Sequence, residues 1–297
     1  MSETIYGGSV ALIGRPNVGK SSVFNAWAGS RHAPISARPH TTWRSQYRLI
    51  RCGERALLMV DAPGWVKNSR SMLHRYMDSQ VRDVISGCDL LLWVVEPMRW
   101  LNEEDAIHDW VRQQEVPIAV LINKIDRMKD KKRLLLFMDQ LRNQVDPAFI
   151  LPVSARNGAG MDLLFDACWD LFPDPEPWQE MPALDSPAMQ WVPDLIRSQA
   201  MERLHQELPY SIAVHVEGWR HEQEKSIIEA CLWVRQPSHK AMVIGKGGQV
   251  IKAIGSAARR VMEENLDQRV DLFLRVKVKE NWDNDPAAIL AMESQGF

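Results

Sequence analysis

Apolar runs of strand length alternate with segments of helical period along the first 172 residues of the chain. The apolar runs are Ser9–Ile13, Leu90–Val95, Ile118–Ile122 and Phe149–Val153, and the helical segments are Met72–Ser86, Asn102–Gln114, Lys132–Val145 and Met161–Leu171. Two further strand-like runs, Ser45–Ile50 and Ala56–Val60, are joined by a turn at Cys52-Gly53, which predicts one antiparallel hairpin. This alternation predicts an α/β domain with a mostly parallel sheet flanked by helices.

The pattern changes where prolines accumulate, at positions 173, 175, 177 and 182. Because proline cannot continue a helix, we expect a linker at 174–190 between a first domain, 1–173, and a second domain, 191–297. The second domain shows strand-like alternation at Tyr210–Val216, Ile227–Arg235 and Val270–Val278, and helical segments on both sides of Gly245–Gly248. The order helix-strand-strand-helix-helix-strand predicts a smaller α+β domain of the type II KH class.

Composition narrows the class of protein. With 297 residues and 45% apolar content, the chain is long enough for two packed domains, and a formal net charge of -2 restricts nucleic-acid binding to a local basic patch. The four cysteines have no close pair, which argues against a disulfide framework or a zinc knuckle. No signal-like N-terminus and no bilayer-length apolar run are visible in the sequence, so we expect a cytoplasmic protein.

The segment Gly14-Arg-Pro-Asn-Val-Gly-Lys-Ser21 lies between the first apolar run and a helix-like segment, which is the setting of a P-loop. Its glycines allow the backbone to wrap a phosphate at a helix N-terminus. We expect Lys20, exposed until phosphate arrives, to reach the β and γ phosphates, and Ser21 to ligate Mg²⁺. The nucleotide-binding residues predicted here are Gly14, Arg15, Pro16, Asn17, Val18, Gly19, Lys20, Ser21 and Ser22.

A second motif, Asp61-Ala62-Pro63-Gly64, follows the apolar run Ala56–Val60 at the strand end where open α/β sheets bind ligands. An aspartate there holds Mg²⁺ through water, and the N–H group of Gly64 meets the γ-phosphate and senses its loss. We therefore add Asp61, Ala62, Pro63 and Gly64 to the nucleotide site.

Two motifs at strand ends are typical of sites that recognise the base of a nucleotide. Asn123-Lys124-Ile-Asp126 follows Ile118–Ile122, and Ser154-Ala155 follows Phe149–Val153. A carboxylate at Asp126 accepts two parallel hydrogen bonds, which matches the N1–H and N2-amino donors of guanine and rejects adenine. Asn123 and Lys124 are expected to tie the loops together, and Ser154-Ala155 to offer a backbone N–H to the base oxygen. The predicted ligands are GTP and GDP.

A switch needs a group whose contacts change when the γ-phosphate leaves. The polar segment Pro39–Trp43 contains two adjacent threonines, and we prefer Thr42 over Thr41 as a Mg²⁺ ligand in the GTP state. The metal site is thus predicted from Ser21, Thr42 and Asp61, and the catalytic groups are Lys20, Thr42 and Gly64. The reaction is attack of water on the γ-phosphate.

In the second domain, Gly245-Lys246-Gly247-Gly248 stands between two helical segments. Such a turn lets an RNA backbone approach closely, and a lysine within it adds positive charge. Lys240 and Lys252 extend this patch. The predicted RNA-binding residues are Lys240, Gly245, Lys246, Gly247, Gly248 and Lys252.

These motifs, together with Leu208-Pro-Tyr210 and Val276-Lys-Val-Lys279, stand in the order found in Era GTPases, which the chain resembles from end to end. The resemblance implies a ribosome-assembly GTPase whose KH domain binds the 3′ region of small-subunit ribosomal RNA, with peripheral membrane association. It also implies slow turnover, because Trp65 stands where Ras-type enzymes carry a water-orienting glutamine, and K⁺ near Asn17 would assist instead. Ala62 and Trp43 depart from the family's usual Thr and Arg.

Two other functions remain open from the sequence. A P-loop kinase for a small molecule lacks a use for the Asp126 motif and the KH-like segment. An RNA-binding assembly factor that binds GTP but hydrolyses it poorly fits the unusual residues at 62 and 65. We expect the protein to act as a monomer on the small ribosomal subunit.

Overall fold

The computed structural model describes residues 6–28, 45–63, 71–172, 188–204, 208–222 and 224–293. The chain forms two compact units, whose longest continuous parts are residues 77–186 and 187–297, and each unit is described by itself. Thr41, Thr42, Trp43, Gly64 and Trp65 lie outside the described residues, as do residues 173–187 of the predicted linker. The domain limits derived from the sequence therefore stay a prediction.

The first unit is built on a six-stranded sheet of order β2-β3-β1-β4-β5-β6, in which only the β2–β3 pair is antiparallel among the described strands. The strands are β1 (Tyr6–Ile13), β2 (Gln46–Cys52), β3 (Arg55–Asp61), β4 (Leu90–Val95), β5 (Ile118–Ile122) and β6 (Ile150–Pro152). The helices are α1 (Lys20–Ala28), α2 (Met72–Ser86), α3 (Asn102–Val111), α4 (Lys131–Val145) and α5 (Leu164–Trp169). The predicted hairpin and mostly parallel sheet are confirmed.

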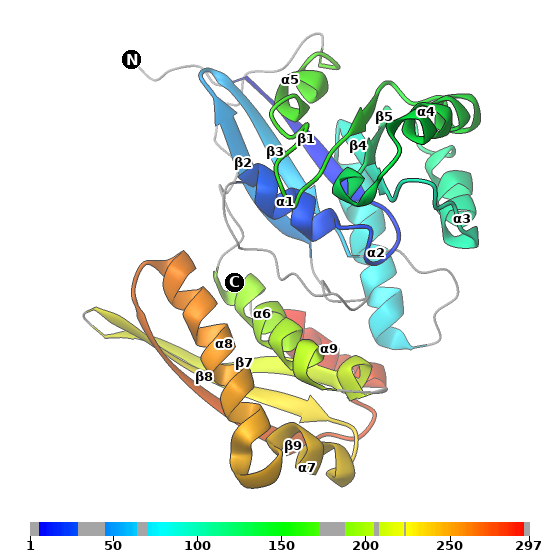
Figure 1. Ribbon diagram of the computed structural model, residues 1–297. Helices are drawn as coiled ribbons and strands as arrows, with labels where there is room; N and C mark the ends of the chain where they lie inside the picture. The colour runs from blue at the N-terminus through cyan, green and yellow to red at the C-terminus, as the bar shows by residue number, and fades with distance from the viewer. Residues whose placement is uncertain are drawn as a thin grey trace. The chain divides into compact units, whose positions relative to one another are not determined.

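Helices cover both faces of this sheet (Figure 1). Apolar side chains of α2, α3 and α4, such as Ile85, Val111 and Leu141, share one core with buried residues of β4 and β5. β4 is buried along its whole length. Burial on both faces explains why β4 and β5 read as continuous apolar runs rather than as alternating ones.

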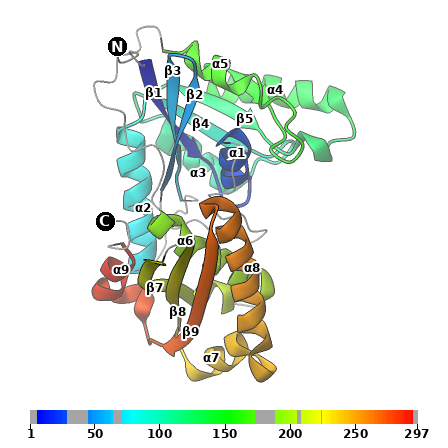
Figure 2. The ribbon, with the colours of Figure 1, turned by 90° about the vertical axis from the view of Figure 1, so that its left-hand side faces the viewer.

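The second unit consists of a three-stranded sheet of order β7-β8-β9 with helices packed on it (Figure 2). Its elements are α6 (Ala188–Arg203), β7 (Ile212–Glu222), β8 (Lys225–Val234), α7 (Pro237–Ile244), α8 (Gln249–Leu266), β9 (Arg269–Val278) and α9 (Pro286–Glu293). β7 and β8 are antiparallel, whereas β8 and β9 are parallel. The order from α6 to β9 is the one predicted for a type II KH domain.

Two helices of this unit differ from the sequence expectation. α6 begins at Ala188, inside the predicted linker, and continues through Pro193. Its residues Trp191, Val192 and Ile196 are buried in the core, so tertiary packing outweighs the cost of a proline within the helix. α9 has no counterpart in the prediction, because its short run Pro286–Glu293 lacks a clear helical period.

Candidate nucleotide site and nucleic-acid interface

The P-loop connects the end of β1 to the start of α1 and adopts backbone conformations that only glycine tolerates well. Gly19 has φ +101°, and a Cβ there would lie 2.3 Å from the Nδ2 atom of Asn123. Gly14 has φ +142°, and a Cβ there would lie 2.5 Å from the carbonyl oxygen of Val94. Both glycines therefore allow the loop to pass against neighbouring strand ends.

Lys20 is the first residue of α1 and its side chain curls back over the loop. Its Nζ atom donates to the carbonyl oxygens of Gly14 at 2.9 Å and Arg15 at 3.2 Å. Lys20 is buried, which corrects the expectation that its ammonium is exposed in the absence of phosphate. Burial lowers the pKa of Lys20 to about 8, although the Asp61 carboxylate partly opposes the shift. The ammonium is thus preorganised but poorly solvated.

Ser21 and Asp61 meet at the head of the P-loop. The hydroxyl of Ser21 donates to the Oδ2 atom of Asp61 at 2.6 Å, and Asp61 is fully buried at the end of β3. Hydroxyl and carboxylate oxygens are the donors that Mg²⁺ prefers. Two of the three predicted metal ligands are therefore brought together, while Thr42 lies outside the described residues.

Asn123 joins the phosphate loop to the base loops. Its Nδ2 atom donates to the carbonyl oxygen of Val18 at 3.0 Å, and its Oδ1 atom accepts from the N–H group of Ala155 at 3.1 Å. Lys124 donates to the carbonyl oxygen of Asn17 at 2.5 Å. The loops that the sequence assigned to phosphate and base are adjacent, as expected from their positions at neighbouring strand ends.

Asp126 lies in a short 3₁₀ turn, Ile125–Arg127, directly after β5. Its Oδ1 atom accepts a hydrogen bond from the hydroxyl of Ser154 at 2.8 Å. The N–H group of Ser154 donates to the carbonyl oxygen of Ala159 at 2.8 Å, and that of Ala155 is engaged by Asn123. A base oxygen at this loop would therefore share the Ala155 donor with Asn123.

The motif after β3 is described only in part. Ala62 is buried and Pro63 is buried beside it, but Gly64 lies outside the described residues. The roles assigned to Gly64 and Thr42 in catalysis therefore stay predictions.

Two carboxylates that the sequence did not single out lie next to the P-loop. The Arg15 guanidinium pairs with Glu96 at 2.7 Å and with Glu104 at 2.5 Å. Glu96 directly follows β4 at the same sheet edge as the nucleotide motifs. This position at a strand end is the feature of the sequence that could have identified Glu96 as a site residue.

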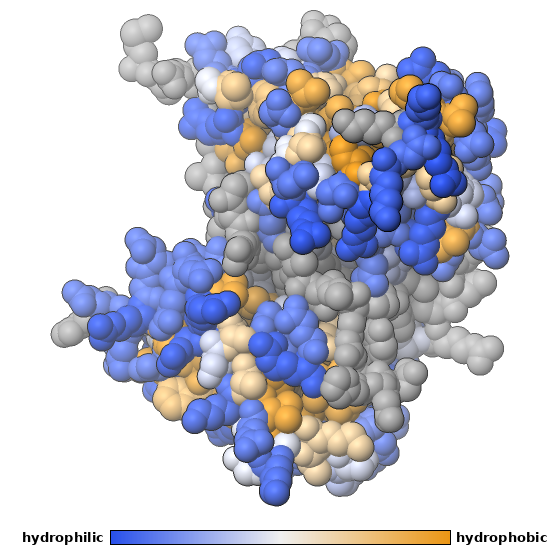
Figure 3. Space-filling view, in the orientation of Figure 1, coloured by the Kyte–Doolittle hydropathy of each residue, from blue (hydrophilic) through white to orange (hydrophobic). Residues whose placement is uncertain are grey.

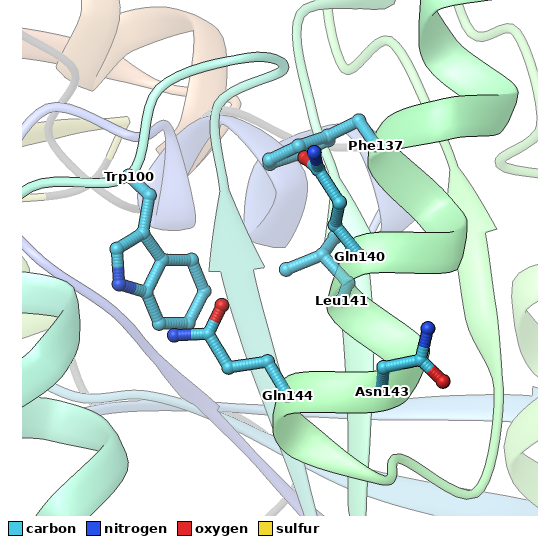
Figure 4. Close-up of a pocket in the computed structure, with 6 residues that line it drawn as sticks. All are labelled: Trp100, Phe137, Gln140, Leu141, Asn143 and Gln144. Atoms are coloured by element: carbon cyan, nitrogen blue, oxygen red, sulfur yellow. The ribbon is translucent and has the colours of Figure 1, made fainter.

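A separate hollow of about 380 Å³ lies between the segment after β4 and helix α4 (Figure 4). It is lined by Trp100, Phe137, Gln140, Leu141, Asn143 and Gln144. None of these residues belongs to the nucleotide motifs, so this hollow is distinct from the P-loop site.

In the second unit, the turn Lys246–Gly248 links α7 to α8 and is open to solvent. A Cβ at Gly247 or Gly248, which have φ +57° and +76°, would meet no atom within 4 Å. Gly245 has a different role, because a Cβ there would lie 2.4 Å from the Cγ2 atom of Val250. Lys246 is exposed, as are Lys240 and Lys252. The predicted basic residues thus flank a turn that a polymer backbone can approach closely.

A shallow cleft of about 230 Å³ runs beside this turn, between α8 and β9. Its lining combines apolar and basic side chains: Ile251, Lys252, Gly255, Ser256, Arg259, Leu272 and Leu274. Figure 3 shows hydrophilic and hydrophobic residues side by side on the described surface of this unit. Apolar walls with basic edges suit unstacked bases and their phosphates. The sequence analysis did not predict that Leu272 and Leu274 of β9 would form one side of this cleft.

Comparison with known proteins gives matches over both units. Residues 9–124 match the family model "50S ribosome-binding GTPase", and residues 207–283 match the family model "KH domain". A curated GTPase Era from Stenotrophomonas maltophilia is 36% identical over 285 residues, covering 96% of each chain. One from Xanthomonas campestris pv. campestris is 35% identical over 294 residues, covering 98% of this chain and 99% of the relative.

Two solved structures of similar proteins cover nearly the whole chain. A crystal structure of Era in complex with MgGDPNP and nucleotides 1506–1542 of 16S ribosomal RNA has a TM-score of 0.91 and 26% identity, covering 97% of this chain and 98% of that one. A crystal structure of a point variant of Aquifex aeolicus Era bound to GDP.AlF4- has a TM-score of 0.90 and 27% identity, covering 97% of this chain and 99% of that one.

Proposed function

The chain belongs to the Era family of GTPases, and on that basis we propose that it is a GTP-hydrolysing switch in small ribosomal subunit assembly, binding small-subunit ribosomal RNA through its KH domain. The nucleotide-binding part of this proposal rests on the Asn123 side chain, which joins the P-loop at Val18 to the loop after β6 at Ala155. The small-molecule kinase considered from the sequence is wrong, since the chain matches GTPases with a KH domain along its whole length.

Each nucleotide group has a proposed partner in the first unit. The P-loop backbone from Gly14 to Ser22 wraps the phosphates, and Lys20 neutralises them. Asp126, oriented by Ser154, selects guanine, and Ala155 serves the base oxygen. Ser21 would ligate Mg²⁺ directly and Asp61 through water. When bound, the ion neutralises charge on the β and γ phosphates.

Hydrolysis places water in attack on the γ-phosphate, with Gly64 and Thr42 as the proposed groups that sense that phosphate. Asn17 holds a left-handed backbone with φ 66°, and its carbonyl oxygen is held by Lys124. The proposed assistance by K⁺ near Asn17 derives from the family resemblance. Slow turnover is expected because Trp65 has no hydrogen-bond acceptor with which to orient water.

The RNA half of the proposal is supported by the open turn Lys246–Gly248 and the cleft between α8 and β9. The solved relative carries nucleotides 1506–1542 of 16S ribosomal RNA, and we propose the same region as the ligand here. The matched family model is named for the 50S subunit, so the test includes both subunits.

The decisive experiment measures GTP hydrolysis and RNA binding together. We expect GTP hydrolysis by the full chain and binding to an RNA of the 16S 3′ region in preference to a scrambled RNA of equal length and to large-subunit RNA. Absence of hydrolysis would overturn the proposed GTPase activity, and equal binding to the three RNAs would overturn the proposed RNA specificity.

No helix among the described residues is long and apolar enough to cross a bilayer. Cytoplasmic location, peripheral membrane association and the monomeric state stay predictions.

A further inference from the structure

Three cationic side chains donate hydrogen bonds to the buried carboxylate of Glu96. Its Oε2 atom accepts from Arg15 at 2.7 Å and from Arg99 at 3.2 Å, and its Oε1 atom accepts from Lys124. The Glu96 side chain is 11% exposed and that of Arg15 is 7% exposed. Glu96 is therefore a buried junction rather than a solvated surface charge.

Two of these partners come from different nucleotide loops. Arg15 belongs to the P-loop, and Lys124 belongs to the base loop after β5. Lys124 also donates to the carbonyl oxygen of Asn17, so the base loop touches the P-loop directly and through Glu96. The carboxylate thus bridges the part of the site that wraps phosphate and the part that faces the base.

Glu104 holds the other side of Arg15. Its Oε1 atom accepts from the Nε atom of Arg15 at 2.5 Å, and its Oε2 atom accepts from the N–H group of Leu101 at 2.9 Å, at the start of α3. Glu104 is fully buried. Glu104 therefore anchors Arg15 to α3, whereas Glu96 connects Arg15 to the base loop, and the two carboxylates have separable effects.

The charges of Arg15 and Lys124 balance those of Glu96 and Glu104. Arg99, whose side chain is 59% exposed, adds a third cation at Glu96. Burial alone raises the pKa of Glu96, but hydrogen bonds from Lys124 and Arg15 outweigh it and hold the pKa at about 2. Without the Glu96 charge, Arg15 and Lys124 would lose the carboxylate that they share, whereas Glu104 would remain paired with Arg15 alone, so the contact between the two loops would weaken.

We propose that Glu96 is a positioning residue that aligns the P-loop with the base loop after β5 and so sets the affinity for guanine nucleotides. The inference rests on the nucleotide site proposed above. GDP and GTP contact both loops at once, so a shift of one loop relative to the other weakens both ligands. Because Glu96 acts through Arg15 and Lys124, its loss should weaken GDP and GTP binding alike.

The experiment uses the nucleotide-free full chain and measures Kd for GDP and for a non-hydrolysable GTP analogue. Glu96→Gln, which keeps the shape and removes the charge, should weaken both by about tenfold. Glu96→Asp keeps the charge and should recover part of the loss. The matched control is Glu103→Gln, an exposed position on the first turn of α3, which should bind as the parent does.

A double-mutant cycle separates positioning from general destabilisation. In a Lys124→Met background, Glu96→Gln should cost much less affinity than in the parent, because the base-loop partner is already absent. Additive effects, or parental affinity in Glu96→Gln, would overturn the proposal. Should Glu96→Gln lose its native circular dichroism spectrum, Glu96→Asp decides alone, and unchanged affinity there overturns the proposal. Failure of the parent chain to bind GDP would instead reject the nucleotide site itself.

Discussion

The hydroxyl of Ser154 donates a hydrogen bond to the Oδ1 atom of Asp126 at 2.8 Å. Asp126 follows β5 and Ser154 follows β6, so the contact joins two neighbouring strand ends. Ser154 is fully buried, which leaves its hydroxyl no competing solvent. The rotation of the Asp126 carboxylate is thereby restricted before a base binds, and in the proposed site this carboxylate is the group that selects guanine.

Asp126→Asn should therefore change the preferred base. An amide presents a donor where the carboxylate only accepted, so xanthosine triphosphate, whose C2 carries an oxygen, should bind better than GTP. Ser154 can still donate to the amide oxygen, so the fold should persist. Competition binding with both nucleotides checks this. An unchanged preference for GTP would show that Asp126 does not read the base.

Lys20→Met should abolish GTP binding and yet stabilise the nucleotide-free protein at pH 7, by about 3 kcal/mol. The reason is the lowered pKa of Lys20, about 8, which results from burial of the ammonium. Between pH 8 and the ordinary value of 10.5 the unfolded chain holds a proton that the folded chain lacks, so the parent gains stability as pH rises. The advantage of the variant should shrink across that window. Urea unfolding at several pH values measures it, and a variant less stable than the parent at pH 7 would contradict the prediction.

Binding of GDP near pH 8 should take up protons. A bound phosphate favours the ammonium form and raises the pKa of Lys20 from about 8, so about half a proton should be absorbed at pH 8 and about a tenth at pH 7. Calorimetry in two buffers of different ionisation enthalpy measures this number. Equal heats in the two buffers at pH 8 would mean that Lys20 is already fully charged without ligand.

Replacing Lys246 and Gly247 together by Asp should abolish RNA binding and leave GTP affinity unchanged. Carboxylates would face phosphates, and Gly247 has φ +57°, which disfavours any side chain. The control is Arg133→Asp with Leu136→Asp on exposed positions of α4, which changes the net charge by the same amount. RNA affinity of the parent should fall as salt rises. Parental affinity of the Lys246 variant at the same salt would place the RNA site elsewhere.

Replacing K⁺ by Na⁺ at constant ionic strength should slow GTP turnover severalfold. The prediction follows from the proposed cation site near Asn17 and from the presence of Trp65 where a water-orienting glutamine would stand. Trp65→Ala should change turnover only modestly. Equal single-turnover rates in the two salts would reject a specific cation.

Short-range patterns determined much of this protein without its tertiary structure. β4 and β5 were predicted at their observed bounds because each is a continuous apolar run between polar ends, a pattern that burial on both faces imposes. The P-loop, Asp61, Asn123 and Asp126 were recognised because each motif stands at a strand end, and parallel strands carry their carboxyl ends to one edge. The order of helices and strands in the KH domain was predicted from the helical segments around Gly245–Gly248 and from the strand-like runs on either side of them.

What depends on side chains far apart in sequence needed the structure. Glu96 and Glu104 lie 81 and 89 positions from Arg15, and the position of Glu96 at a strand end does not by itself show that Arg15 pairs with either carboxylate. Lys20 was expected to be exposed, but the folding of its loop over the strand ends buries it and lowers its pKa. α6 continues through Pro193 because Trp191, Val192 and Ile196 are buried in the core. In each case the outcome is decided by burial and charge pairing, which depend on neighbours that only tertiary packing supplies.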